Sequence, residues 1–164
     1  RKNHKFIIDS VGELRKQIPT IKVLFAGRGR LMEAMIEYAK HKGFDSYIDF
    51  LGFRKDIGQL IALSDVGISA SRQEGLGLNL AEEMFAGLPV VATVDRGHKE
   101  IVRDEYNGFM YAQLDHGGFE NAVYKLYQNP ELRKKMGENA KDYIQKFSLS
   151  NALAALTEIY RKYM

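Results

Sequence analysis

Several residue types and patterns are missing from this 164-residue chain, and each absence excludes a class of protein. There is no cysteine, which excludes a disulfide-stabilised scaffold, a thiolate zinc site and a cysteine nucleophile. No apolar run approaches the roughly 18 residues of a membrane span. One of the two longest uncharged stretches, Met84 to Val94, contains a glycine and a proline. The basic first residues are not followed by the apolar segment of a signal peptide.

A strong excess of charge of one sign is also missing. The 24 Lys and Arg residues against 21 Asp and Glu give a net charge of +3, too small to indicate a nucleic-acid partner. The four histidines have no metal-ligand spacing, so we expect no metal site. Apolar residues make up 45% of the chain, which is enough to bury the core of one domain, residues 1–164.

Segments of two hydrophobic periods alternate along the chain. Short apolar runs predict buried strands at 23–26, 48–52, 66–70, 89–93 and 108–111. Apolar residues at helical spacing predict helices at 6–14, 31–38, 56–64, 78–86, around 100, and three more from 119 to 164. Asn129-Pro130 is expected to open one of the last three helices, and Ser148 to cap another.

This alternation indicates a parallel sheet covered by helices on both faces. The predicted fold class is therefore α/β, a Rossmann-like doubly wound sheet followed by C-terminal helices. The first predicted element is a helix, whereas such domains normally open with a strand. We therefore expect that Arg1 follows a strand that this sequence does not include.

Ligands of open parallel sheets bind beyond the carboxyl ends of the strands, so the functional residues are expected in the loops there. The loop Gly27-Arg28-Gly29 follows the first strand and suggests a dinucleotide fingerprint. Met32 stands where that fingerprint requires its third glycine, and no Walker sequence is present. We interpret this loop as a tight strand-to-helix turn.

The loop after the third strand contains more groups suited to a ligand. Gly75 and Gly77 allow the backbone to approach a ligand closely, and a helix begins directly after them. Free N–H groups and the positive end of the helix dipole meet at Gly77, Leu78 and Asn79. These residues are the predicted phosphate site.

Two glutamates flank this predicted phosphate site. Glu82 lies one turn beyond Leu78 on the same helix face, and its carboxylate can reach a polar group beside the phosphate, such as a ribose diol. Glu74 precedes the helix, where a carboxylate would accept hydrogen bonds from hydroxyl groups. Either residue alone is interpreted equally well as a surface acid. Their spacing, together with the glycines and the preceding strand, favours a binding site.

The segment from Glu74 to Ala92, EGLGLNLAEEMFAGLPVVA, resembles the signature of retaining glycosyltransferases of the large GT-B group. Residues 50–53 (FLGF) with 64–66 (SDV), and 96–100 (RGHKE) with 107–109 (NGF), resemble two further segments of that family. The RGH-basic-E variant is particularly similar to capsular and exopolysaccharide transferases. The resemblance covers essentially the whole chain, as the C-terminal half of such an enzyme.

The resemblance implies a nucleotide diphosphate sugar, UDP- or GDP-linked, as the donor substrate. Glu82 then holds the ribose hydroxyls and Glu74 contacts sugar hydroxyls near the reacting carbon. Lys2 neutralises the diphosphate and helps it depart. The resemblance also implies that the diphosphate is faced by the backbone amides of Leu76, Gly77, Leu78 and Asn79. It further implies that the base is contacted by Phe53 and Arg54. No metal ion or other cofactor is expected.

The same resemblance implies a glycan or lipid-linked acceptor, bound by an N-terminal domain that this sequence does not include. An arginine that partners the family's lysine would also fall before Arg1. We therefore expect this chain to bind donor but to transfer little or no sugar alone. The whole enzyme is expected in bacterial surface polysaccharide synthesis, in the cytoplasm or peripherally at the inner membrane face. His98 either faces the cleft or has a structural role.

Two other functions were weighed against sugar transfer. A nucleotide-sugar epimerase or a phosphorylase half shares the GT-B architecture but uses different acids, and the spacing of Glu74 and Glu82 favours transfer. A regulatory receiver module needs clustered acids around a phosphorylatable aspartate. The candidate aspartates, which are Asp45, Asp49, Asp65 and Asp95, do not form that pattern.

Overall fold

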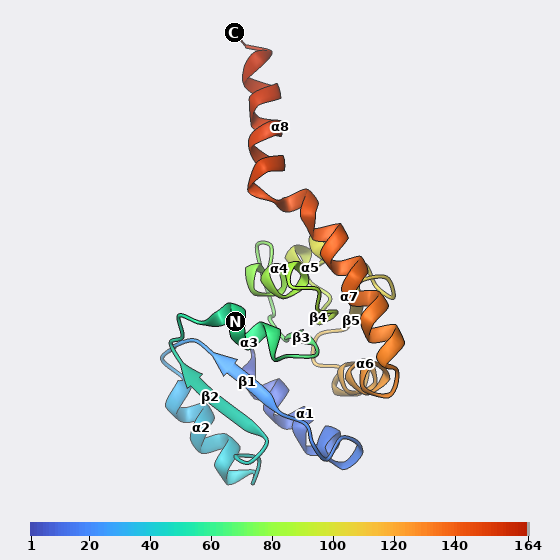
Figure 1. Ribbon diagram of the computed structural model, residues 1–164. Coiled ribbons are helices and arrows are strands. Elements are labelled where there is room, and N and C mark those ends of the chain that lie inside the picture. Colours follow the sequence, from blue (N-terminus) through green and yellow to red (C-terminus); the bar gives the residue numbers. More distant parts are fainter. Residues whose placement is uncertain (164) are drawn as a thin grey trace.

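The computed structural model describes residues 1–163 and shows an α/β body from which one helix projects (Figure 1). Its strands match the apolar runs of the sequence and are β1 (Val23–Ala26), β2 (Ile48–Gly52), β3 (Gly67–Ser69), β4 (Val90–Thr93) and β5 (Gly108–Tyr111). The helices that alternate with them are α1 (His4–Gln17), α2 (Met32–His41), α3 (Ile57–Ala62), α4 (Leu78–Phe85) and α5 (Arg96–Ile101). The chain continues through α6 (His116–Gln128), α7 (Pro130–Ile144), a 3₁₀ turn (Gln145–Phe147) and α8 (Leu149–Arg161).

The predicted helix boundary signals are confirmed. The side chain of Asn129 accepts a hydrogen bond from the Leu132 N–H at 3.0 Å, and Pro130 is the first residue of α7. Ser148 Oγ caps α8 by accepting from the Asn151 N–H at 3.4 Å. Such caps satisfy N–H groups that have no partner inside the helix.

The strands form two parallel ladders. β1 pairs with β2, and β3, β4 and β5 pair in that order. Within residues 1–163 no ladder joins β1 to β3. The resulting order, β2-β1 and then β3-β4-β5, is that of a doubly wound sheet without the strand at its centre. The predicted α/β class and parallel pairing are confirmed, while the single continuous sheet is divided in two.

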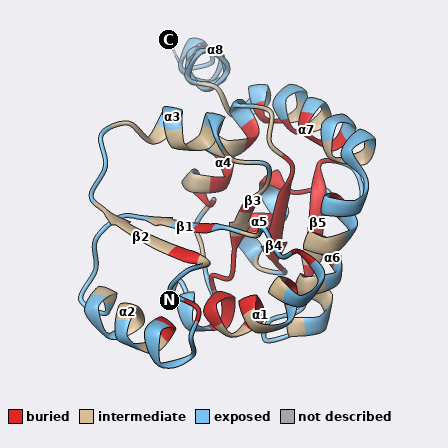
Figure 2. Cartoon of the chain, turned by 60° about the horizontal axis from the view of Figure 1, so that its bottom comes forward, coloured by how far each residue is buried: buried red, intermediate tan, exposed pale blue. Residues whose placement is uncertain are grey.

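The two sheets differ in burial (Figure 2). Every residue of β4 is buried, with exposed fractions of 0–2%. In β2 only the first residue is buried, and the other four are intermediate. The core of this body is completed by the broad apolar face of α1, which buries Phe6, Ile7, Ile8, Val11 and Leu14. A second cluster joins α4 to α7 through Leu80, Met84, Ala140 and Ile144.

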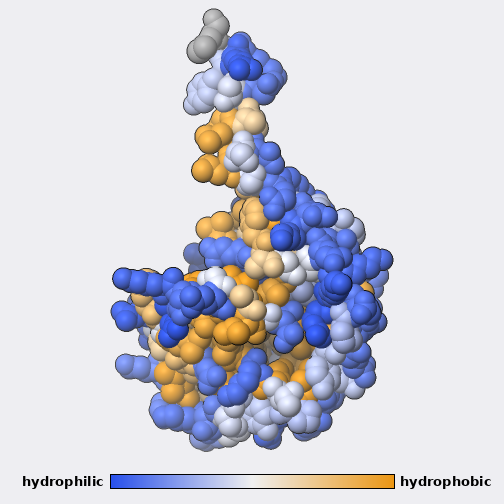
Figure 3. Space-filling model, viewed as in Figure 1, coloured by the Kyte–Doolittle hydropathy of each residue, from blue (hydrophilic) through white to orange (hydrophobic). Residues whose placement is uncertain are grey.

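Helix α8 extends away from the body (Figures 1 and 3). Its exposed apolar side chains include Leu149, Leu153 and Leu156, whose spacing places them along one side of the helix. Among the described helices, none is both long enough and apolar enough to cross a bilayer.

Candidate functional site

A pocket of about 540 Å³ lies beyond the carboxyl end of β3. Its lining comes from the segment before α1, from the β3–α4 loop and from the first turn of α4. The lining residues are Lys2, Glu74, Gly75, Leu76, Gly77, Leu78 and Asn79. All of them except Gly75 were predicted as site residues from the sequence. The fold therefore brings Lys2 to a loop more than seventy positions away in the chain.

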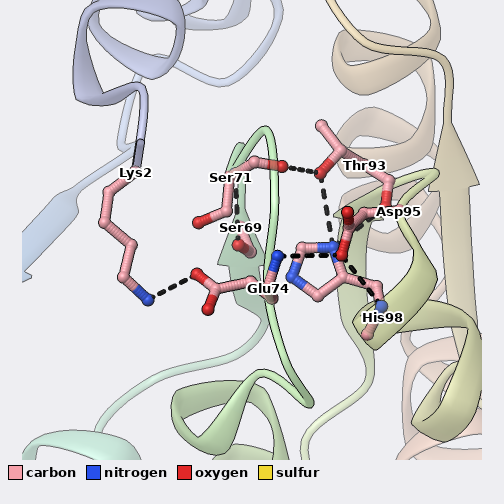
Figure 4. Close-up of polar contacts among 8 residues, drawn as sticks. Lys2, Ser69, Ser71, Glu74, Thr93, Asp95 and His98 are labelled. Carbon is pink, nitrogen blue, oxygen red and sulfur yellow. Dashed lines mark hydrogen bonds and ion pairs between the residues drawn. The ribbon is translucent and has the colours of Figure 1, made fainter.

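Lys2 and Glu74 form an ion pair in this pocket, with Nζ and Oε1 2.6 Å apart (Figure 4). The Lys2 side chain is 54% exposed and that of Glu74 is 15% exposed. Partial burial raises the pKa of Glu74, but the hydrogen bond from Lys2, the nearby Ser71 hydroxyl and the charge of Lys2 together outweigh burial, so this pKa lies below its usual value. Glu74 is therefore an ionised acceptor beside a cation at neutral pH.

Residues 1–4 bridge the ends of β1 and β3 and so fix the position of Lys2. The Arg72 N–H donates to the Arg1 carbonyl at 3.0 Å, on the β3 side. The His4 ring lies 4.9 Å from the Phe25 ring of β1, edge to face. Asn3, between them, adopts left-handed backbone angles with φ 54° and leads into α1.

The first turn of α4 presents polar groups to the pocket. Gly77 is the N-cap with φ 89°, a conformation that glycine adopts without strain, and no side chain caps the helix. There is no acidic residue in the first turn, so the positive end of the helix dipole is not neutralised locally. Within the described chain, Asn79 Oδ1 is buried without a hydrogen-bond partner. This end of the pocket is suited to an anionic, hydrogen-bonding ligand.

The loop that carries Glu74 is hydrogen-bonded to the start of α5 (Figure 4). Asp95 Oδ2 accepts hydrogen bonds from the Glu74 N–H at 3.0 Å and from the Gly97 N–H at 2.9 Å. A β-carbon on Gly97 would lie 2.5 Å from the Glu74 carbonyl oxygen, so only glycine permits this approach. Asp95 and Gly97 were not predicted as site residues. An aspartate at a helix start indicates a cap for that helix but not the hydrogen bond to the Glu74 loop.

Buried polar side chains continue this support. Thr93 Oγ1 donates to the Ser71 carbonyl at 2.6 Å, and His98 Nδ1 lies 2.9 Å from the Thr93 carbonyl. Of the two roles considered for His98, the geometry supports the structural one, because the residue is 0% exposed beneath the loop. In the described residues, His98 Nε2 and Ser71 Oγ are buried without partners.

Three predicted site residues lie outside the pocket lining. Glu82 is exposed on α4. Phe53, after β2, is 60% exposed, and the Arg28 guanidinium lies 5.8 Å from its ring centre. Arg54 makes a bidentate ion pair with Asp56, with Nε–Oδ1 and Nη2–Oδ2 distances of 2.8 and 2.5 Å. The roles given to these three residues, and to the predicted residues that line the pocket, remain predictions. The part of the chain that the structure describes contains no cluster of three or more His, Asp or Glu able to hold a metal ion.

The fold and this pocket together define a Rossmann-like domain with a pocket beyond the carboxyl end of β3, where ligands of such sheets bind. The chain belongs to the family described as glycosyl transferases group 1, whose family model matches residues 1–143. This membership confirms the resemblance seen in the sequence.

Individual relatives agree with this assignment. EpsD of Bacillus subtilis strain 168, which is named as a glycosyltransferase, is 37% identical over 163 residues, which are 99% of this chain and 43% of EpsD. N-acetyl-alpha-D-glucosaminyl L-malate synthase of Bacillus anthracis is 26% identical over 140 residues, 85% of this chain and 37% of that enzyme. This chain therefore spans less than half the length of these relatives.

The solved structures show the same fold. Anabaena HepE, in complex with UDP-glucose, superposes with a TM-score of 0.85 at 24% identity, covering 97% of this chain and 45% of HepE. Staphylococcus aureus TarM, in a complex that includes UDP, has a TM-score of 0.90 at 21% identity, covering 97% of this chain and 33% of TarM. These likenesses confirm the fold class expected for half of a GT-B enzyme.

Proposed function

We propose that this chain is the donor-binding domain of a retaining glycosyltransferase. The whole enzyme moves a sugar from a nucleotide diphosphate to a glycan or glycolipid acceptor in surface polysaccharide synthesis, in the cytoplasm or at the inner membrane face. One observation carries the proposal. The Lys2–Glu74 pair, at 2.6 Å, lies in one pocket with the uncapped start of α4. The likeness to EpsD and the UDP-bound neighbours support it.

In this proposal the diphosphate of the donor binds at the α4 N–H groups and beside Lys2. Negative charge grows on the diphosphate as the glycosidic bond breaks, and a cation and N–H donors at that place lower the barrier. Glu74 accepts hydrogen bonds from sugar hydroxyls and stabilises positive character at the ring. Glu82 holds the ribose, and Phe53 with Arg54 lies against the base. No metal ion takes part.

We also propose that residues 1–164 are one domain of a longer enzyme whose additional strand lies between β1 and β3. Residues 1–4 already connect the carboxyl ends of these two strands, where a strand leading into α1 would end. The doubly wound strand order places its first strand at this position. Amide hydrogen exchange compares the longer protein with this chain. Added protection along β1 and β3 supports the proposal, and unchanged protection contradicts it.

Calorimetry with UDP, GDP and ADP tests the donor site directly. We expect one nucleotide to bind at millimolar affinity or better, and Glu82→Ala to weaken it about tenfold through loss of the ribose contact. Glu138→Ala, which removes an exposed glutamate of α7, is the control and should leave the affinity unchanged. If no nucleotide binds at millimolar concentration, the proposed function is wrong.

A further inference from the structure

We propose that Asp95 is a positioning residue that holds Glu74 toward the sugar, and that it determines how much the sugar adds to the affinity for the donor. The inference rests on the proposed function, because it assigns a determinant to the same pocket. It concerns a residue outside the pocket lining, which acts through the Glu74 backbone and does not touch the ligand.

The position of Asp95 is fixed independently of the loop that it supports. It is the N-cap of α5, with extended backbone angles, and its Oδ2 accepts the Gly97 N–H at 2.9 Å. The same oxygen accepts the Glu74 N–H at 3.0 Å, so one atom joins the helix to the loop. Burial raises the pKa of Asp95, but backbone N–H donors, first that of Glu74, outweigh burial and keep its pKa below the usual value. Both hydrogen bonds are therefore to a charged acceptor, the stronger kind.

Two further contacts leave the loop little freedom between Glu74 and Gly77. The Glu74 carbonyl lies so close to Gly97 that a β-carbon there would be 2.5 Å away. At the other end of the loop, a β-carbon on Gly77 would lie 3.1 Å from Cδ2 of the buried His98 ring. Of these three contacts, only the hydrogen bond to Asp95 orients the Glu74 N–H. When it is lost, the backbone that carries the Glu74 carboxylate can rotate within the space that the other two contacts leave.

The phosphate end of the pocket has a separate anchor. Helix α4 is fixed by Leu80 and Met84, both 0% exposed, which pack on Ala140 and Ile144 of α7. Loss of the Asp95 contact therefore releases Glu74 while the first turn of α4 stays in place. The expected effect is selective. The sugar loses its contribution to binding, and the nucleotide diphosphate keeps its own.

A simple capping role for Asp95 predicts a different result, and two variants separate the roles. Asp95→Asn keeps an oxygen that can accept both N–H groups. Asp95→Ser keeps a short N-cap for α5 but is too short to reach the Glu74 N–H. The matched control is Asp115→Ala, because Asp115 caps α6 by accepting the Gly118 N–H at 2.9 Å and lies outside the pocket lining.

The experiment measures affinities for UDP and UDP-glucose, or for GDP and GDP-mannose if the protein prefers guanine. We expect Asp95→Ala and Asp95→Ser to lose about fivefold in affinity for the nucleotide sugar, the effect of one hydrogen bond, with UDP affinity changed less than about twofold. Asp95→Asn, whose neutral oxygen is a weaker acceptor than the carboxylate, should fall between the wild-type protein and Asp95→Ser, and Asp115→Ala should match the wild-type protein. Thermal unfolding of Asp95→Ser establishes that it is folded.

Three outcomes would overturn the inference. They are an equal loss for UDP and UDP-glucose in Asp95→Ser, an unchanged affinity for the nucleotide sugar in that variant, and a loss in Asp115→Ala of the same size. Failure of the proposed function has a different signature, because the wild-type protein would then bind neither ligand.

Discussion

The two sheets each end in a glycine-containing loop, and the surroundings of these loops differ. After β1, Gly27 and Gly29 have no atom within 4 Å of the place where a β-carbon would stand. After β3, the loop from Glu74 to Gly77 is held by Asp95, Gly97 and His98. Glycines after a strand therefore do not by themselves make a site. A second element must fix the loop.

The largest effect is expected at Glu83, on the helix that follows the β3 loop. Its side chain packs against Gly67, where α4 meets β3. Burial, and next the charge of Glu82, raises the pKa of Glu83 from 4.5 to about 8. The folded state therefore keeps a proton that the unfolded state loses, and stability falls as pH rises from 4.5 to about 8. The total fall in the free energy of unfolding is on the order of 5 kcal/mol, and Glu83→Gln should remove it.

Urea denaturation between about pH 5 and pH 8.5 measures this effect as the difference between Glu83→Gln and the wild-type protein. Glu138→Gln, at an exposed site on α7, should retain the wild-type profile. Parallel profiles for Glu83→Gln and the wild-type protein would contradict the prediction.

A matched pair of glycine substitutions compares the two loops themselves. Gly97→Ala should lower the free energy of unfolding by about 1–3 kcal/mol, because its β-carbon meets the Glu74 backbone, which cannot move aside cheaply. Gly29→Ala meets nothing within 4 Å and should change stability by less than about 0.5 kcal/mol. Chemical denaturation of both variants measures the difference. Equal losses would mean that the two loops are equally constrained.

A matched pair of lysine substitutions separates the local effect of Lys2 on nucleotide binding from the effect of net charge. Lys2–Glu74 and Lys16–Glu13 are ion pairs in which the lysine is exposed, and their Nζ–Oε1 distances are 2.6 and 2.7 Å. Each should contribute less than about 1 kcal/mol to stability. Lys2→Met should nevertheless weaken binding of the nucleotide diphosphate about tenfold, since a cation beside the phosphates is lost. Calorimetry on Lys16→Met should show no change, and a similar loss there would assign the effect to net charge.

The smallest expected effect lies beside the first sheet, at Phe53. If its ring lies against the base, Phe53→Ala should weaken nucleotide binding by about three- to fivefold, the contribution of one aromatic contact. Leu63→Ala is the control, because Leu63 is 81% exposed at the end of α3. Neither variant should change stability by more than about 0.5 kcal/mol. An unchanged nucleotide affinity in Phe53→Ala would remove this residue from the site.

Local signals predicted the elements of this fold, and tertiary contacts decided the rest. The strand at 89–93 was predictable because Val90, Val91 and Ala92 form a continuous apolar run after Gly87 and Pro89. The division into two sheets was not predicted, because strand pairing depends on segments far apart in sequence. The burial of Glu83 depends on the missing side chain of Gly67 on another element, which no pattern along α4 indicates.

The site divides in the same way. Glu74, Gly77 and Asn79 were predictable because a strand, a glycine loop and a helix start follow one another in the chain. Lys2 was placed through the family resemblance, and the structure brings it to Glu74. The contribution of Asp95 depends on a hydrogen bond to a loop 21 positions earlier, which no local pattern reveals.

In this domain by itself, the separation of β1–β2 from β3–β4–β5 determines which part opens more easily. β4 has a hydrogen-bonded neighbour on each side and is fully buried, so its amides can exchange with solvent only when most of the body unfolds. In the described chain, β1 and β2 pair only with each other and are less covered. Their opening is therefore a local event of lower free energy. Lys2 contacts the loop after β3, in the part of the domain that opens rarely, whereas Phe53 follows β2, in the part that opens more often.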